Sequence, residues 1–206
     1  MIYLIITTSI NSKFNTYNYE GRKNRYIESI QSALSLVTNY EIIKPIIVEN
    51  NGPRNTFLND FSCDIIYTNN NMIDVQHKGI TELLDIKQVI TQYNISDDDV
   101  IIKLTGRYKI LDDSFFNLVI NNCNNRDAFV KFFNVCTLKY EFNDCALGLL
   151  ALKCRYFRNF NYECTESPEV EIATYVRKNI KKEKIMEIHN LGLECCFADD
   201  LRLLNV

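Results

Sequence analysis

The sequence is poor in the residues and patterns that mark several protein classes. It has no Trp, 3 Pro and 6 Gly in 206 residues, which excludes collagen-like and Gly/Pro-rich low-complexity chains. No apolar run approaches the roughly 18 residues of a membrane span, so we expect no transmembrane segment. A net charge of -3 leaves no basic excess, and this argues against nucleic acid as a partner.

The cysteines also lack the spacing of a metal site. The chain has 8 Cys but no Cys-x-x-Cys pair, and the adjacent Cys195 and Cys196 do not fill a zinc site alone. With 47% hydrophobic residues the chain can build its own core, so we expect reduced, mostly buried thiols. The opening "MIYLIITTS" has no basic segment before its apolar run and no cleavage site after it, so it predicts a strand of a cytoplasmic protein.

Apolar runs alternate with helical patterns through the chain. Six runs rich in Ile, Val, Leu, Tyr and Phe predict strands: 2–8, 42–50, 64–68, 99–104, 127–133 and 145–152. Several of them are continuous, which is typical of strands covered on both faces. Residues 22–37 and 78–93 instead place apolar side chains at helical spacing.

This order of elements predicts an α/β fold. Right-handed crossovers would build one open, mixed and mainly parallel sheet flanked by helices, in a single domain spanning 1–206. A later helix should begin with Ser167 as N-cap and Pro168 at its first position, and the tail 191–206 predicts a strand and a short helix. Ligands of such sheets bind beyond the carboxyl ends of the strands, where the candidate residues therefore lie.

The first two strand exits carry groups that suit a nucleotide. Thr7 and Thr8 end the first run, and arginines, among them Arg25, open the next helix, where one could bind a phosphate. Glu49 and Asn50 follow the second run and offer the donors and acceptors that a base or ribose needs. A solvated strand end or an ordinary Asn-Gly turn explains the same residues equally well.

The third and fourth exits carry cations. Lys78 opens the helix 78–93, whose free backbone N–H groups suit an anion. Lys103 lies inside the fourth apolar run, and burying it is costly unless it meets an anion. Thr105 and Gly106 form a turn that allows close backbone approach, and Arg107 follows. These residues fit a diphosphate, and the alternative is a structural ion pair with Asp112, Asp113 or another carboxylate.

Three acids are candidates for catalysis. Asp144 precedes a small apolar segment and could hold a sugar hydroxyl or cap a turn. Glu169 and Glu171 lie in the first turn of the helix that follows Ser167, where one could act as a general base. Helix capping alone accounts for both of these glutamates.

Taken together, "ENNG", "DDDVIIKLTGRY", "NDCALG" and "SPEVEIA" resemble small nucleotide-sugar glycosyltransferases of the GT-A fold over nearly the whole chain, most specifically in "IIKLTGRY". The resemblance implies transfer of a sugar from a nucleotide-diphosphate donor to a glycan or glycoconjugate acceptor. Residues 1–110 would bind the nucleotide through Thr7, Thr8, Glu49 and Asn50, with Lys78 at the diphosphate. Residues 111–206 would form the acceptor side, where Glu169 or Glu171 activates the acceptor hydroxyl.

The chain departs from that family at its metal motif. Members commonly hold Mg²⁺ or Mn²⁺ with Asp-x-Asp at the exit of the fourth strand, where this chain has Lys103 and Arg107. Asp97 and Asp99 have the motif's spacing but precede the strand, so they should lie at the opposite edge of the sheet. We therefore expect no metal site, with His189, Asp199 and Asp200 as the alternative if Mn²⁺ or Mg²⁺ binds.

Two other functions fit the same pattern. The missing metal motif suits a non-catalytic nucleotide-sugar or glycan-binding domain of this fold. A sugar nucleotidyltransferase would have a Gly-rich loop after the first strand, and "TTSINSKFN" contains no glycine. The sequence does not identify the sugar, the base, the acceptor or the stereochemical outcome.

Overall fold

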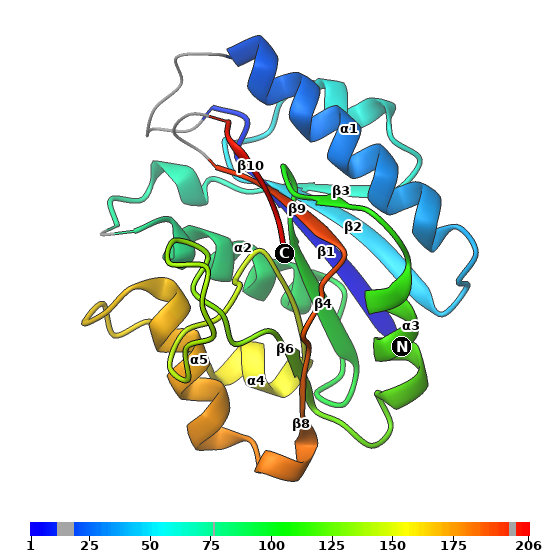
Figure 1. Cartoon of the computed structure of the whole chain (residues 1–206). Helices are drawn as coiled ribbons and strands as arrows, with labels where there is room; N and C mark the ends of the chain where they lie inside the picture. Colours follow the sequence, from blue (N-terminus) through cyan, green and yellow to red (C-terminus); the bar gives the residue numbers. More distant parts are fainter. Residues whose placement is uncertain (12–18, 76, 198–200) are drawn as a thin grey trace.

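A seven-stranded sheet forms the centre of the protein (Figure 1). The computed structural model describes residues 1–11, 19–75, 77–197 and 201–206. In the order in which they pair, the strands are β3 (Asp64–Tyr67), β2 (Ile43–Glu49), β1 (Ile2–Thr8), β4 (Val100–Thr105), β7 (Leu149–Lys153), β6 (Ala128–Val130) and β8 (Ile185–Glu187). All neighbours pair in parallel except β7, which is antiparallel to β4 and β6. The predicted mixed, mainly parallel α/β sheet is confirmed.

Helices cover both faces of this sheet. The helices α1 (Tyr19–Val37) and α3 (Ser114–Asn122) share a core with one face of β1 and β4. The helices α2 (Lys78–Gln92), α4 (Cys154–Asn159) and α5 (Pro168–Asn179) pack on the other face. Every residue of β4 is buried, which explains why its sequence is continuously apolar except for Lys103 and Thr105.

A small second sheet contains the C-terminal strands. It consists of β10 (Leu203–Asn205), β9 (Leu193–Cys196) and β5 (Lys109–Ile110), in that order. The tail was expected to end in a short helix, but its second element in the described residues is the strand β10. The reason is pairing, because Leu203 to Asn205 lie antiparallel to β9 and the N–H of Val206 donates to the oxygen of Leu193.

Most predicted elements have the expected position and differ at their ends. Each of the six apolar runs contains a strand, but the run 145–152 is in the sheet only from Leu149. Ser167 caps α5 as predicted, since its side chain accepts from the N–H of Val170 at 3.3 Å. The pattern reading did not assign α3, α4 or β5, nor the short 3₁₀ turns at Phe57–Asp60, Asn70–Met72 and Lys182–Lys184.

The carboxyl ends of β1, β2, β3 and β4 open at one edge of the sheet, as does the loop after β6. The N-termini of α2 and α5 meet at this edge, where a Cβ on Gly79 would lie 2.8 Å from the Cβ of Pro168. All eight cysteines are free thiols; four of them are buried, three are half-buried and Cys136 is exposed. No helix in the described ranges is long and apolar enough to cross a bilayer.

Candidate functional site

A cleft of two adjacent chambers lies at this carboxyl edge. The larger chamber has a volume of about 440 Å³, and its lining includes Lys78, Glu82, Lys103, Arg107, Tyr108 and Glu169. The smaller chamber has a volume of about 30 Å³, and its lining includes Thr7, Thr8, Arg22, Asn50, Lys78 and Arg107. The two are adjacent, because Lys78, Glu82 and Arg107 line both. The predicted edge of the sheet is therefore hollow, and cations predominate at the junction.

Lys103 is buried, as expected, but its ammonium group is already fully bonded. Only 3% of the residue is exposed. Its Nζ lies 2.8 Å from a carboxylate oxygen of Glu82 and donates to the Thr105 hydroxyl at 2.8 Å and to the oxygen of Leu147 at 2.7 Å. An ammonium has three N–H donors, and all three are used here. Lys103 therefore joins β4 to α2 and to the segment before β7, and its partner is Glu82 rather than Asp112 or Asp113.

Arg107 extends from the exit of β4 into the cleft. Its Nε donates to the oxygen of Cys196 at 2.7 Å, and its guanidinium lies over the ring of Tyr108, 5.2 Å from the centroid. The preceding Gly106 allows this exit to touch β1, because its N–H donates to the oxygen of Thr7 at 2.8 Å and a Cβ would meet Thr8 at 2.8 Å. The close approach predicted for the Thr-Gly turn is thus to β1.

Tyr108 forms a wall of the larger chamber. Its ring fills the space beside Gly148, where a Cβ would lie 2.1 Å from the ring. Burial raises the pKa of Tyr108 to about 12, so its hydroxyl stays protonated at neutral pH. The glycine before β7 therefore determines the shape of the chamber.

Two arginines at the start of α1 have different environments. Arg25, the predicted ligand, bonds to the oxygen of Arg107 at 2.9 Å and to the carboxylate of Glu194 at 2.7 Å, so it ties α1 to β4 and β9. Arg22 instead lines the smaller chamber. The sequence does carry a signal that Arg22 is buried at the cleft. Arg22 precedes the buried Tyr26 by one helical turn, so both residues lie on the buried face of α1, which Arg22 extends to the cleft.

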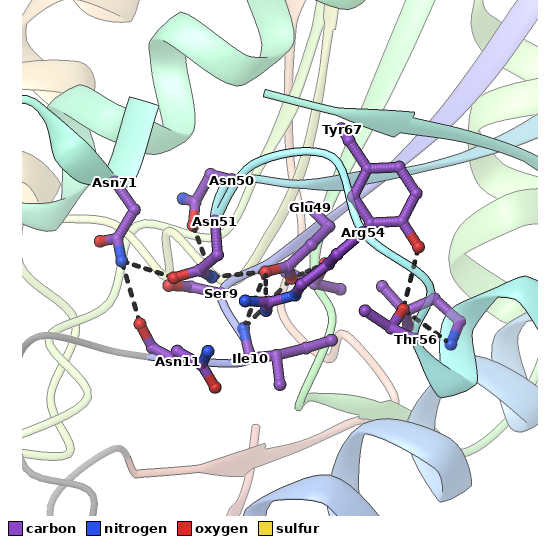
Figure 2. A network of polar contacts seen from close by, with 12 residues as sticks. Ser9, Ile10, Asn11, Glu49, Asn50, Asn51, Arg54, Thr56, Tyr67 and Asn71 are labelled. Carbon is purple, nitrogen blue, oxygen red and sulfur yellow. Dashed lines mark hydrogen bonds and ion pairs between the residues drawn. The ribbon is translucent and has the colours of Figure 1, made fainter. Parts of the chain in front are cut away.

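The predicted nucleotide residues bond mainly to one another. Figure 2 shows Glu49 inside a network in which its carboxylate accepts from the N–H of Ile10 at 3.1 Å and from Arg54 at 3.1 Å. The carboxylate also accepts from the Thr8 hydroxyl at 2.8 Å and from the Asn51 amide. Glu49 is 0% exposed and connects the segments that follow β1 and β2. Thr7 donates to the oxygen of Leu104 at 3.4 Å, so its hydroxyl faces β4.

A buried carboxylate that the sequence reasoning missed organises two of these exits. Asp85 of α2 accepts from the Asn50 amide at 3.0 Å, the Thr68 hydroxyl at 2.6 Å and the Asn70 amide at 2.7 Å. Burial raises the pKa of Asp85 to about 7, although these three bonds act in the opposite direction. The residue connects α2 to the exits of β2 and β3.

The three candidate catalytic acids lie in different places. Glu169 lines the larger chamber from the first turn of α5. Glu171 lines a separate cavity, and its carboxylate accepts from the backbone N–H groups of Glu163, Thr165 and Glu166 at 2.7, 2.8 and 3.2 Å. Asp144 is buried and accepts from Asn134 at 2.8 Å, and burial raises its pKa. Glu169 is therefore the predicted acid that faces the cleft.

The described residues do not fit a divalent-cation site. No three His, Cys, Asp or Glu side chains gather in the described ranges, and Glu82, which lines the cleft, is bonded to Lys103. His189 is exposed, and Asp199 and Asp200 lie outside the described residues. Asp97 and Asp99 lie at the far end of β4, where Asp97 bonds to Arg158 at 2.9 Å and Asp99 to the N-terminal amine at 2.7 Å.

No known protein family and no curated protein matches the sequence significantly. Solved structures do match the fold. A Bacillus anthracis protein described as a glucose-1-phosphate thymidylyltransferase has a TM-score of 0.58 and 12% identity, over 91% of this chain and 87% of that one. A Desulfovibrio desulfuricans G20 protein described as a nucleotide-diphospho-sugar transferase has a TM-score of 0.55 and 8% identity, over 91% and 79%.

A third match is the 4-diphosphocytidyl-2C-methyl-D-erythritol synthase of Anaerococcus prevotii DSM 20548, with a TM-score of 0.52 and 14% identity, over 91% of this chain and 86% of that one. At such identities the likeness concerns the fold alone. The chain therefore has the GT-A-like fold that these proteins share.

Proposed function

We propose that the protein is a glycosyltransferase that moves a sugar from a nucleotide-diphosphate donor to a glycan or glycoconjugate acceptor. The observation that supports this most directly is the polarity of the cleft. Arg22 lines its smaller chamber, Lys78 and Arg107 line both chambers, and Glu169 lines the larger one alone. A diphosphate leaving group requires cations, and a hydroxyl nucleophile requires a base, so the two ends suit the two parts of one transfer reaction.

The proposed step is a substitution at the anomeric carbon of the donor sugar. An oxygen of the acceptor forms a bond to this carbon while the bond to the donor phosphate oxygen breaks. The nucleoside diphosphate leaves with the electron pair, and the cations at the junction stabilise its charge. The acceptor proton passes to the carboxylate of Glu169. A base in this role contributes roughly 10²- to 10⁴-fold to a rate.

The two halves of the chain would then have separate tasks. Residues 1–110 supply the cations and the exits of β1 to β4, so they bind the donor. Residues 111–206 supply Val135, Leu147, Gly148 and Glu169 to the larger chamber, so they bind the acceptor. The nucleotide would bind beside Asn50 and the ends of β1, β2 and β3. The hydrogen bonds of Glu49 and Asp85 hold the backbone of these strand ends in place.

Donor hydrolysis tests this proposal without knowledge of the acceptor. The protein is incubated with UDP-, GDP-, CDP- and dTDP-sugars, with and without Mn²⁺, and the release of nucleoside diphosphate is measured. We expect release with one base, and a fall of roughly 10²-fold or more in Glu169→Gln with donor affinity retained. Glu166→Gln is the matched control, because this acid is exposed and outside both chambers. Binding of none of these nucleotides would overturn the proposal.

Sugar nucleotidyl transfer is the second candidate, because one of the matching folds is described as a glucose-1-phosphate thymidylyltransferase. Release of pyrophosphate from a nucleoside triphosphate and a sugar phosphate would favour it. A third outcome identifies a binding domain: a nucleotide sugar binds tightly, turnover is absent with every acceptor, and Glu169→Gln changes nothing.

A further inference from the structure

Arg22 carries a buried charge that the described part of the chain leaves incompletely bonded. The residue is 4% exposed. Its Nη2 donates to the oxygen of Ser9 at 2.9 Å and to the Tyr26 hydroxyl at 3.1 Å, whereas Nε and Nη1 are buried without a partner. A buried guanidinium with unused donors is unfavourable, because it has lost its water without a replacement. The site is therefore incomplete without a further acceptor.

The other cations around the cleft show what complete bonding looks like. Arg25 has Glu194 at 2.7 Å, and Lys103 has Glu82 at 2.8 Å. Neither Arg22 nor Arg107 has a carboxylate within 4.0 Å in the ranges that the structure describes. Both of these unpaired guanidinium groups line the smaller chamber. Glu82 also lines this chamber, but its carboxylate is paired with Lys103, so the two guanidinium groups that face this small space favour a further anion between them.

The geometry also indicates which kind of anion fits. Planar guanidinium groups bind phosphate oxygens through paired N–H donors. The rings of Tyr26 and Tyr108 lie 5.3 and 5.2 Å from the Arg22 and Arg107 guanidinium carbons, so both groups are held in place before a ligand arrives. Arg107 lines both this chamber and the larger one, whose lining includes Glu169. A diphosphate at this junction would present its attached group to Glu169.

We propose that Arg22 and Arg107 bind the diphosphate of the donor directly and supply the charge neutralisation that a divalent cation gives in other proteins of this fold. This inference rests on the proposed function for the identity of the donor. That the site binds an anion is inferred separately, from the two guanidinium groups that have no carboxylate partner among the described residues. The described carboxylates do not gather into a metal site, which agrees with the assignment.

Calorimetry with inorganic pyrophosphate and with UDP, GDP, CDP and dTDP tests the inference, each in EDTA and then in Mn²⁺. We expect pyrophosphate to bind in EDTA, and both Arg22→Gln and Arg107→Gln to weaken it at least about tenfold, because each removes a charge-assisted contact. Arg22→Lys should restore part of the affinity. Arg158→Gln is the control, since Arg158 lies at the opposite edge of the sheet.

A melting curve of the free protein separates a ligand role from a structural one. If Arg22 is held unpaired for an anion, Arg22→Gln raises the melting temperature of the ligand-free protein while it weakens binding. A lowered melting temperature together with unchanged pyrophosphate affinity would overturn the inference.

The remaining outcomes separate this inference from the proposed function. Nucleotide binding that requires Mn²⁺ and does not change in Arg22→Gln overturns the inference and leaves the proposed function standing. Pyrophosphate binding in EDTA that Arg22→Gln abolishes, with no nucleotide bound, supports the anion site and overturns the proposed function. Absence of binding by pyrophosphate and by every nucleotide overturns both.

Discussion

At the residue scale, three buried cations in or beside the cleft differ in their bonding. Lys103, Arg22 and Arg25 are all under one-tenth exposed. Lys103 and Arg25 have carboxylate partners, and Arg22 has none among the described residues. A paired buried charge supports the fold, whereas an unpaired one is retained for another reason. The same residue type therefore has opposite expected effects on stability at these positions.

Lys103→Met should destabilise the protein. The change leaves the carboxylate of Glu82 without its cation and the oxygen of Leu147 without its donor, so we expect the free energy of unfolding to fall by about 3 kcal/mol. Urea denaturation measures this fall. Pyrophosphate affinity of the folded variant should change little, because all the donors of Lys103 are used internally.

A double-mutant cycle with Glu82→Gln tests the stated cause. Removal of both partners should cost less than the sum of the single changes, by about 1 kcal/mol or more. Strict additivity, or loss of pyrophosphate binding in a stable Lys103→Met protein, would contradict this account.

The sequence predicted that Lys103 is buried and needs an anion, and this much follows from its position in an apolar run. The identity of the anion was not accessible. Glu82 lies one turn inside α2 and reaches Lys103 only after α2 packs on the sheet. The sequence also could not show that Arg25 and Arg22 have different partners, because Glu194 on β9, which bonds to Arg25, is distant in sequence.

At the element scale, α2 organises the exits of three strands. Asp85 bonds to groups that follow β2 and β3, and Glu82 bonds to Lys103 of β4. The sequence predicted β1 to β4 because each is a continuous apolar run that ends at polar residues. It did not predict α4 or β5, since so short an element has too few residues for a period to show. Their formation depends on tertiary packing.

Asp85 should make stability depend on pH. Its pKa in the folded protein is raised from the ordinary 3.8 to about 7, so the folded protein holds a proton there that the unfolded chain has released. The free energy of unfolding should therefore fall as pH rises from about 4 to about 7, by up to about 4 kcal/mol, and level off above that range. Urea denaturation at several pH values measures this dependence.

The variant Asp85→Asn isolates the contribution. It should be less stable than the parent, because its amide places a donor among the donors of Asn50, Thr68 and Asn70, but its stability should lack this part of the pH slope. Asp60→Asn, at an exposed acid, should retain the parent slope. An unchanged slope in Asp85→Asn would show that Asp85 ionises normally.

At the scale of the whole molecule, the two proposed functional halves share one sheet. β4 of the first half pairs with β1 on one side and with β7 of the second half on the other. The strand β9 pairs with β5, and Val206 belongs to the core that α1 and α3 share. Side-chain hydrogen bonds also link the two halves, because Arg25 bonds to Glu194 and Arg107 to the oxygen of Cys196. The proposed division at 110 therefore lies within one folding unit.

A fragment of residues 1–110 should not fold alone. It would expose one hydrogen-bonding edge of β4, the core face that α3 and β9 cover, and the cations that Glu194 and the oxygen of Leu147 bond. An unpaired apolar strand at the centre of a sheet favours aggregation over a stable edge. We expect the full chain to unfold in one cooperative urea transition, seen alike by far-ultraviolet circular dichroism and by tyrosine fluorescence. The fragment should show no such transition. A cooperative transition of the fragment, together with pyrophosphate binding in EDTA, would show instead that the proposed donor-binding half is an independent domain.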